Sequence, residues 1–465
     1  MKNDILIAER IAKAVEQHGG RAYYVGGYVR DLLLGKENKD IDIEVHGVTP
    51  KTLEEILDGI GTRLSMGESF GIYGLRGCSV DIAMPRKEHL RGTGHRDFDV
   101  FVDPFIGTKK AAMRRDFTVN AMMQDVLTGE IVDHFGGRED LTRGVIRHVN
   151  DETFGEDALR VLRAAQFASR FEFTVAPETV ARCRSMTLSH LAHERIEAEM
   201  KKALLKSARP SVFFEVLREM DQLREWFPEL LALIGIPQPP RYHGEGDVWT
   251  HTMMVLDEGA SIRERTENPY AFMLACVTHD FGKAICTTET DGAIHAYGHE
   301  RAGLTPARRF LRRITGERKV IDYVLNLTEL HMRPNMSASQ NASVKSTNKL
   351  FDAAIDPEGL IAIAVADERG RIAEVPAPQN EAFLRERLCI YRETMARPCV
   401  MGKDLIDAGL TPGTYFTEAL AYAHKLHLAG VNKDSALIQT VAYARKLAKR
   451  PNSTPKPATN ASEDI

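Results

Sequence analysis

The hydrophobic pattern of this chain changes once, near Gly155, and no other feature constrains the fold as strongly. Before that point apolar residues recur at both strand and helix spacing, whereas after it they recur almost entirely at helix spacing. The pattern predicts a small head of strands and helices followed by a long helical remainder. The chain has 465 residues, 43% of them hydrophobic, which is enough material for more than one domain.

Charge and cysteine content narrow the class of protein. The 61 basic and 65 acidic residues nearly balance, so any surface for nucleic acid has to be local. The six cysteines show no C-x-x-C spacing, which favours free thiols in a reducing compartment. The charged N-terminal segment is unlike a signal peptide, and no later run is long enough to span a bilayer. We therefore expect a cytoplasmic protein that does not enter a membrane.

A group of carboxylates gives the first candidate site. Residues 39–45 alternate polar and apolar side chains, so a strand there places Asp40 and Asp42 on one face. Carboxylates this close repel each other, and a shared divalent cation relieves the repulsion. A solvated strand face is the alternative for such a pair taken alone. Asp81 lies in a second alternating run, and pairing of the two strands would bring it to the other carboxylates.

A glycine pair upstream of these carboxylates suggests a phosphate site. Gly26 and Gly27 follow a predicted strand over residues 21–25. They precede a short predicted helix, residues 28–34, with Arg30 in its first turn. Backbone N–H groups, a helix N-terminus and a guanidinium group would then converge on a triphosphate, although an ordinary tight turn is the alternative. Three carboxylates beside a phosphate loop are what in-line phosphoryl transfer with two metal ions requires.

Four ordered motifs resemble a known family. They are V-G-G-Y-V-R-D-L-L-L-G with D-I-D (25–42), R-R-D-F-T-V-N-A-M (114–122), G-E-D-A-L-R-V-L-R-A (155–164) and H-E-R-I-E-A-E (193–199). In order and spacing they resemble the class II tRNA nucleotidyltransferase and bacterial poly(A) polymerase family. The resemblance covers the first half of the chain. It implies an α+β fold in which a small mixed-sheet nucleotidyltransferase head precedes an all-helical neck and body.

The resemblance also implies roles for individual residues. Asp40 and Asp42 would bind Mg²⁺, with Asp81 as the third catalytic carboxylate. The remaining nucleotide-binding positions would be Gly26, Gly27, Arg30, Arg114, Arg115, Asp116, Asn120, Asp157, Arg160 and Arg163. For Asp157 and Arg160, three residues apart on a predicted helix, spacing alone favours a surface ion pair. The resemblance instead makes them a protein template that pairs with the edge of a C or A base, with Arg163 and the segment Glu194 to Glu199 as supports that orient the pair.

A second candidate site lies in the helical region. Its residues recur on successive predicted helices: His251, His279, Asp280, His299, His331 and Asp367. Imidazole and carboxylate together suit Mn²⁺, Fe, Ni²⁺ or Zn²⁺. The pattern resembles the HD phosphohydrolase superfamily, which makes His251, His279, Asp280 and Asp367 the first metal ligands. His299 and His331 would then complete a second metal position or contact phosphate.

The same resemblance gives the second site an expected chemistry. Lys283 would neutralise a phosphate, and the site would act as a phosphatase or cyclic phosphodiesterase on RNA ends or small nucleotides. A folded but catalytically idle domain is the alternative. The order of the two domain types matches the HD-bearing bacterial CCA-adding enzymes, whereas alarmone synthetase/hydrolases have the hydrolase first.

Proline-rich breaks at 237–240 and 376–378 suggest the domain boundaries. We expect a head (1–141), a helical neck and body with the nucleobase template (142–240), an all-helical HD metal domain (241–371), a C-terminal helical segment (372–449) and a disordered tail (450–465).

The function expected from these features is addition of C and A nucleotides to the 3′ end of tRNA from CTP and ATP. Within the family, a poly(A) polymerase and an enzyme restricted to A or to CC are alternatives. The short, mixed tail argues against polyadenylation, for which we expect a long basic extension. A nucleotide phosphohydrolase with a non-catalytic nucleotide-binding head is the alternative from another class. Oligomeric state stays open.

Overall fold

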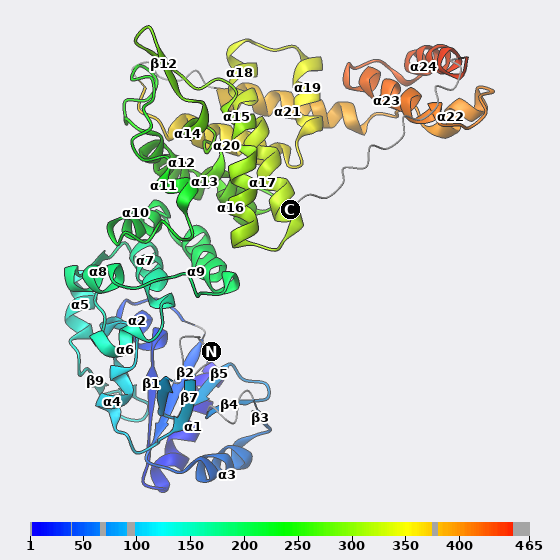
Figure 1. The fold of residues 1–465 in the computed structure, drawn as a ribbon. Helices are drawn as coiled ribbons and strands as arrows, with labels where there is room; N and C mark the ends of the chain where they lie inside the picture. Colours follow the sequence, from blue (N-terminus) through cyan, green and yellow to red (C-terminus); the bar gives the residue numbers. More distant parts are fainter. Residues whose placement is uncertain (1, 39, 66–70, 91–97, 374–379, 450–465) are drawn as a thin grey trace, which may run out of the picture.

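The computed structural model describes residues 2–38, 40–65, 71–90, 98–373 and 380–449. These residues form an elongated molecule, with a sheet-containing head at one end and helices over the rest (Figure 1). The predicted α+β class is confirmed, because the mixed-sheet head precedes a mostly helical remainder. The predicted disordered tail, 450–465, lies outside the described residues. None of the described helices combines the length and apolar character that a membrane crossing requires.

The head is built on a seven-stranded sheet of order β3-β4-β5-β2-β1-β8-β9. Its strands are β1 (Arg21–Val25), β2 (Ile41–His46), β3 (Arg63–Ser65), β4 (Ile72–Leu75), β5 (Val80–Ala83), β8 (Met123–Asp125) and β9 (Ile131–Val132). Strands β2 and β5 pair in parallel, whereas the other neighbouring strands are antiparallel. Strands β6 (Arg86–Leu90) and β7 (Phe98–Val102) form a separate antiparallel pair.

The alternating sequence of β2 explains how the sheet packs. Ile41, Ile43 and Val45 are buried in the main hydrophobic core, which helix α1 also enters. Successive side chains of a strand point to opposite faces, so Asp42 and Glu44 lie on the other face of the sheet. The helical elements of the head are α1 (Lys2–Gln17), α2 (Gly27–Leu33), α3 (Pro50–Ile60), α4 (Thr108–Met113), the 3-10 turn η2 (Thr118–Asn120) and α5 (Gly137–Arg143).

The neck and body consist mainly of six helices. They are α6 (Asp151–Gly155), α7 (Leu159–Phe171), α8 (Pro177–Arg184), α9 (His193–Lys206), α10 (Ser211–Glu219) and α11 (Pro228–Leu231). The expectation that this part is all-helical is wrong in one detail. Strands β10 (Val145–Ile146) and β11 (Thr174–Val175) pair in parallel. Strands of two residues are too short to show an alternating pattern, so periodicity could not reveal them.

The region of the second candidate site is also helical apart from one hairpin. Its helical elements are α12 (Val248–Ile262), the 3-10 turn η3 (Arg263–Arg265), α13 (Pro269–Thr278), α14 (Lys283–Cys286), α15 (His299–Ala302), α16 (Leu304–Ile314), α17 (Arg318–Leu330), α18 (Met332–Ser339), α19 (Val344–Ala353) and α20 (Pro357–Arg369). Strands β12 (Thr288–Thr290) and β13 (Ala293–His295) form the hairpin, which corrects the all-helical prediction. Asp291 and Gly292 at its turn have φ angles of 53° and 74°. Two consecutive positive φ angles are typical of a type I′ hairpin turn.

Helix α21 (Asn380–Ala396) packs into the main core through Leu384 and Leu388. The last three helices, α22 (Gly402–Asp407), α23 (Tyr415–Leu428) and α24 (Lys433–Ala448), form a small unit with a core of its own. Leu405, Ala419 and Ala444 are buried in a cluster separate from the main core. The helix and following turn predicted for residues 402–413 are confirmed. In Figure 1 helices α22 to α24 extend away from the rest of the molecule.

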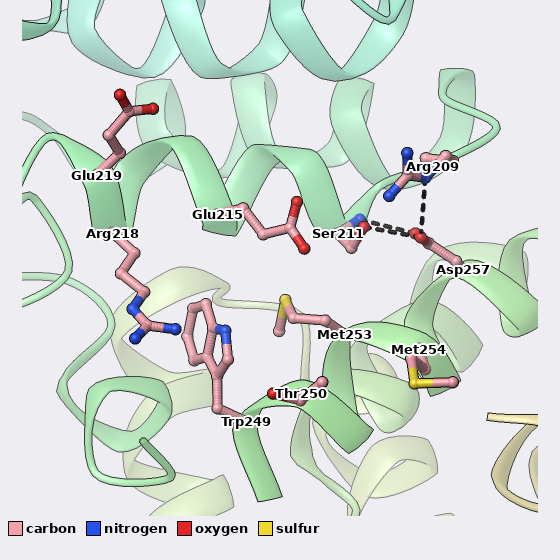
Figure 2. A pocket seen from close by; sticks show the side chains of 10 residues that line it. All are labelled: Arg209, Ser211, Glu215, Arg218, Glu219, Trp249, Thr250, Met253, Met254 and Asp257. Carbon is pink, nitrogen blue, oxygen red and sulfur yellow. Dashed lines mark hydrogen bonds and ion pairs between the residues drawn. The ribbon is translucent and has the colours of Figure 1, made fainter. Parts of the chain in front are cut away.

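Polar contacts join the body to the region that carries the second site. The Asp257 carboxylate on α12 accepts hydrogen bonds from the Ser211 backbone N–H at 2.9 Å and from the Ser211 hydroxyl at 2.7 Å (Figure 2). It also pairs with Arg209 at 3.4 Å. The Arg218 guanidinium lies 5.4 Å from the centre of the Trp249 ring. These contacts surround a cavity of about 530 Å³ between α10 and α12.

Candidate active sites

The strand pairing of the head brings two of the predicted carboxylates together. In the parallel pair of β2 and β5, Asp42 lies directly opposite Asp81, so both side chains are on the same face. Asp40 is exposed and immediately precedes β2. Burial, and then the charge of Asp81, raise the pKa of Asp42, and the charge of Asp40 adds to this while Arg115 opposes it. Carboxylates that repel each other in this way fit a divalent cation with oxygen ligands.

The glycine loop lies beside this carboxylate pair. Gly26 has a φ of 68°, a conformation that side chains other than glycine rarely adopt. A Cβ atom at this position would lie 3.1 Å from Arg115 Nη1 and 3.8 Å from Asp42 Oδ2. Gly27 then begins helix α2. The fold therefore brings together three residues that lie up to 89 positions apart in the sequence: Gly26, Asp42 and Arg115.

Arg115 and Arg114 border a cavity next to the carboxylates. Arg115 Nη2 lies 3.5 Å from Glu44 Oε2, and the other Glu44 oxygen lies 2.8 Å from His46 Nε2. Burial raises the pKa of Glu44, but the His46 and Arg115 contacts outweigh it and lower the pKa. Arg114 donates a hydrogen bond to the Arg86 carbonyl. The cavity at these arginines has a volume of about 280 Å³, and Glu44 lines it as well.

Arg30 and Asn120 belong to a buried network behind the loop. Arg30 is only 3% exposed and donates hydrogen bonds to Asp31 at 2.7–2.8 Å and to Asn120 Oδ1 at 2.7 Å. Its guanidinium lies 4.6 Å from the Phe171 ring centre. The structure thus places Arg30 in the interior, where its contacts hold Asn120 in place. The predicted phosphate contact of Arg30 stays a prediction.

Asp116 continues the same network. Its Oδ2 accepts hydrogen bonds from Arg163 Nε at 2.7 Å and pairs with Arg163 Nη2 at 2.6 Å, and its Oδ1 accepts one from Asn120 Nδ2 at 3.0 Å. Burial raises the pKa of Asp116, but the charge of Arg163 and the Asn120 hydrogen bond outweigh it, so the pKa is lowered. Arg163 also lies 3.9 Å from Glu199. These contacts fix Asp116 and Asn120 as a rigid pair between η2 and α7.

The two residues predicted as a base template lie at the start of α7. Asp157 Oδ2 pairs with Arg195 Nη2 at 2.8 Å, and Asp157 Oδ1 accepts the Leu159 backbone N–H at 3.0 Å. Spacing suggested an ion pair between Asp157 and Arg160, but Asp157 pairs instead with Arg195 on α9. Arg160 donates to the carbonyls of Thr153 and Arg114, each at 2.7 Å. Arg160 thus connects α7 to the arginines of the head.

Arg195 lies within the segment 194–199, which the family resemblance makes a support for the template pair, and it is the residue there that contacts Asp157. It lies in the His193–Lys206 helix, α9, within the H-E-R motif. A basic residue following His193 and Glu194 is visible in the sequence, but its pairing with Asp157, just before α7, is not.

All six predicted residues of the second site converge in the structure. His251, His279 and Asp367 have ligand atoms within 4.8 Å of one another, as do Asp280, His299 and His331. Asp280 joins the two groups, because one oxygen lies 3.2 Å from His279 Nε2 and the other 3.3 Å from His299 Nε2. His251 Nε2 lies 3.0 Å from Asp367 Oδ1. The recurrence of these residues along the sequence therefore corresponds to one buried cluster.

The imidazoles of this cluster are oriented as metal ligands. His279, His299 and His331 each have Nδ1 within 2.7–2.9 Å of a backbone carbonyl, those of Cys276, Ala296 and Thr328. A carbonyl only accepts, so each Nδ1 carries the proton and each Nε2 presents a lone pair to the centre. The Nε2 atoms of His299 and His331 face each other at 3.2 Å. Two facing lone pairs fit a metal cation held by these nitrogen atoms.

The protonation of the cluster supports the same interpretation. Burial and the neighbouring His279 lower the pKa of His331 to about 3, which keeps this imidazole neutral. Lys283 and His279 outweigh burial and hold the pKa of Asp280 well below its usual value. For His251, burial lowers the pKa, but hydrogen bonds to Asp367 and Glu245 outweigh it and raise the pKa to about 9. The neutral His331 imidazole beside carboxylate anions is a donor set that binds transition metals.

His243 and Glu245 also belong to this site, and sequence reasoning missed them. Glu245 Oε1 lies 2.8 Å from His243 Nδ1 and 3.1 Å from His251 Nδ1. A carboxylate at the outer nitrogen of a ligand histidine fixes the ring and raises its basicity. The segment Y-H-G-E-G just before His251 contains two metal-binding residue types, and this is the signal that could have found them.

A cavity of about 350 Å³ opens onto this cluster. Asp280, His299 and Asp367 line it on the cluster side. Lys283 lines it as well, and its ammonium group lies 2.6 Å from Asp280 and 2.8 Å from Gln238 Oε1. The predicted phosphate-neutralising lysine is therefore placed where a substrate in the cavity would reach both it and the cluster.

Known proteins resemble this chain in sequence. Residues 22–147 match a family model described as the poly A polymerase head domain, and residues 172–234 match one described as the probable RNA and SrmB-binding site of polymerase A. The chain is 39% identical over 316 residues to the multifunctional CCA protein of Actinobacillus pleuropneumoniae serotype 5b, covering 66% of this chain and 74% of the relative. It is 37% identical over 376 residues to the multifunctional CCA protein of Pasteurella multocida, covering 78% and 87%.

Solved structures extend the similarity to nearly the whole chain. The Thermotoga maritima CCA-adding enzyme complexed with tRNA superimposes with a TM-score of 0.62 over 94% of each chain, at 22% sequence identity. This likeness concerns the fold, and the sequence identity to the curated relatives carries the family assignment. The chain belongs to the class II tRNA nucleotidyltransferase family, among its CCA-adding members.

Proposed function

We propose that this protein adds C and A nucleotides, from CTP and ATP, to the 3′ end of tRNA. The observation that carries the proposal is the alignment of Asp42 with Asp81 beside the Gly26 loop and Arg115. The family of the chain supports it, since the curated relatives are multifunctional CCA proteins. The tRNA complex of the similar T. maritima enzyme supports tRNA as the partner.

The residues of the head fit the requirements of nucleotidyl transfer. Asp40, Asp42 and Asp81 would hold Mg²⁺, which would activate the 3′-hydroxyl of the tRNA and neutralise the triphosphate. Arg115 and the backbone N–H groups of the Gly26 loop bind the triphosphate in line with the attacking hydroxyl. The buried Asp116–Asn120 pair keeps the floor of the nucleotide site rigid.

The start of α7 gives the base selection. Asp157 supplies a carboxylate acceptor and Arg160 a guanidinium donor, so together they pair with the Watson–Crick edge of C or A and reject G and U. Arg195 holds the Asp157 side chain at 2.8 Å. Rearrangement of the Asp157 and Arg160 side chains would admit either C or A at this site.

The experiment uses labelled CTP or ATP and three tRNA transcripts, ending before the first C, after CC, and with complete CCA. Stepwise completion that then stops is the expected result. Continued incorporation of A on unrelated RNA would replace the proposal with a poly(A) polymerase, and completion from only one of the incomplete transcripts would restrict it to A or to CC addition. Phosphate release without incorporation would leave the nucleotide phosphohydrolase as the interpretation.

We propose a second function, metal-dependent hydrolysis of phosphate esters or 2′,3′-cyclic phosphates, for the histidine and aspartate cluster. The observation that favours it is the convergence of four imidazole Nε2 atoms with Asp280 and Asp367 at one end of a cavity that contains Lys283. The donor set suits Mn²⁺, Ni²⁺, Fe or Zn²⁺, and Mg²⁺ is a further candidate. Metal analysis of purified protein, together with phosphate release from 2′-AMP and 2′,3′-cyclic AMP, tests it. Bound metal without any release would show an idle domain.

We also propose that the predicted units 1–141, 142–240, 241–371 and 372–449 are the functional divisions of the chain. The seven-stranded sheet, which carries the carboxylates, ends at β9 inside the first unit. The metal cluster lies wholly in the third.

A further inference from the structure

The entrance of the cavity at the metal cluster carries exposed aromatic side chains. Tyr297 is 82% exposed and Tyr242 is 53% exposed, and both line this cavity. Exposed large aromatic side chains beside a binding cavity are typical of a ligand-binding surface. Tyr242 precedes α12, and Tyr297 follows strand β13, so the two tyrosines come from separate segments of the cavity wall.

The Tyr297 ring is held in one orientation by its neighbour. His295 and Tyr297 stack with ring centres 5.0 Å apart and an angle of 13° between the planes. The β12–β13 hairpin, closed by Asp291 and Gly292, supports this pair. One face of Tyr297 is therefore occupied by His295, and the ring offers flat aromatic surface to a ligand at a low cost in conformational entropy.

The aromatic pair is linked directly to the metal cluster. His299 follows Tyr297 by two residues, and its Nδ1 lies 2.8 Å from the Ala296 carbonyl. Two positively charged residues, Lys283 and Arg371, also line this cavity. Arg371 Nε is buried and makes no hydrogen bond with the described residues. The cavity thus combines an aromatic wall, two cations and the metal-ligand candidates.

We propose that Tyr297, which follows the β12–β13 hairpin and stacks on His295 at its end, is a base-binding wall of this site, so that the terminal base of a nucleotide stacks on Tyr297 while its phosphate lies between Lys283 and Arg371. The inference rests on the proposed phosphohydrolase function and adds to it the side chain that contacts the base of a nucleotide substrate. Bases stack on aromatic side chains regardless of their identity, so the wall selects for a base without reading its sequence.

Binding to the metal-free, full-length protein tests the wall without any hydrolysis. The probe is 2-aminopurine riboside 3′-monophosphate, whose fluorescence is quenched when the base stacks. Tyr297→Ala is expected to weaken binding about tenfold, which lies within the usual range for loss of one base–aromatic stack. Tyr297→Phe should restore both binding and quenching, and Phe105→Ala, which removes a 66% exposed aromatic in the head, is the matched control. Equal binding by wild type and Tyr297→Ala would overturn the proposal.

Kinetics with the metal-loaded enzyme give a second readout. The ratio of kcat/KM for 2′-AMP to kcat/KM for glycerol 2-phosphate, which lacks a base, should fall about tenfold in Tyr297→Ala, mainly through KM. An unchanged ratio would contradict the wall. If the wild type hydrolyses neither substrate with any of the candidate metals, the phosphohydrolase proposal fails. The fluorescence measurement would still show whether a base stacks on Tyr297. Tighter binding of an oligoribonucleotide ending in 2-aminopurine than of the mononucleotide would identify RNA ends as the source of the base.

Discussion

At the scale of single residues, Asp42 and Asp280 are each expected to control one reaction. Asp42→Ala removes the carboxylate that faces Asp81 and should lower nucleotide incorporation by a factor on the order of 10²–10³ or more, while phosphate release persists. Asp280→Ala removes the residue that joins the two ligand groups and should have the opposite effect. Each variant is the control for the other, measured on the same preparation in both assays. Loss of both reactions in both folded variants would refute the existence of two separate sites.

Arg160 gives a prediction about selection rather than rate. Because its proposed partner is a base edge, Arg160→Ala should lower the preference for CTP and ATP over UTP and GTP by about 10- to 100-fold. The KM for the triphosphate should change less, since Arg115 remains. Arg170→Ala, at the other end of the same helix, is the matched control. An unaltered preference in single-nucleotide competition assays would exclude Arg160 from the template.

Residue-level prediction succeeded where geometry follows from local sequence and not where it depends on packing. The face shared by Asp42 and Glu44 follows from strand periodicity alone, whereas Asp40 lies just before the strand. The interior position of Arg30 depends on the packing of α2 against Phe171 of α7, which no local pattern records. The role of Asp42 is the prediction that the Asp42→Ala variant tests.

At the scale of secondary-structure elements, the ion pair between Asp116 and Arg163 joins the 3-10 turn η2 to α7. Since Arg163 and Asn120 lower the pKa of Asp116, this group stabilises the folded state above the ordinary carboxyl pKa, and the contribution is lost as the pH falls through the lowered pKa. Asp116→Asn should therefore lower the free energy of unfolding by about 2–3 kcal/mol at pH 7. The loss is smaller than that expected from breaking a fully buried ion pair, because Arg163 is partly exposed.

The measurement is thermal unfolding of wild type and Asp116→Asn between pH 3.5 and pH 7. The difference in Tm should be widest near neutral pH and should narrow below about pH 4, where the wild-type carboxyl begins to lose its advantage. Glu139→Gln, which breaks an exposed pair with Arg143, should show almost no difference at any pH. A difference that stays constant down to pH 3.5 would contradict a stabilising role for the ionised Asp116.

Element prediction was reliable for long periodic segments and poor for short ones. The sequence Asp291-Gly292 is a signal for the turn of the β12–β13 hairpin. The two strands have only three residues each, so the helical periodicity of the flanking segments determined the prediction for this region. Helix α7 begins at Leu159, so Asp157 precedes the helix that spacing alone would extend over it. The Asp157 backbone carbonyl still accepts the Arg160 N–H, which keeps the two residues adjacent.

At the scale of the whole molecule, the contacts around Asp257 connect the body to the region of the metal cluster. Asp257→Ala removes two hydrogen bonds with Ser211 and the ion pair with Arg209, and should cost about 1–3 kcal/mol of unfolding free energy. Glu258→Ala, the next carboxylate on α12, is the matched control. Calorimetry should show a lower Tm for the first variant and a smaller change for the second. Equal effects would mean that the junction depends on apolar packing alone.

The order of the two sites along the chain could be predicted from sequence, because each depends on motifs separated by readable spacing. Their relative placement could not, since it depends on contacts such as Arg218 with Trp249 that join distant helices. The separate core of the C-terminal helices likewise follows from which apolar faces meet, and periodicity alone does not specify this.

The central claim is that Asp42 and Asp81 hold a divalent cation next to a bound nucleotide. A crystal of the full chain with Mn²⁺ and a non-hydrolysable CTP analogue, measured at the manganese absorption edge, tests it directly. We expect an anomalous peak between these two carboxylates, with the triphosphate at Arg115 and the Gly26 loop. A well-ordered analogue bound elsewhere, or bound there with no peak at these carboxylates, would contradict it.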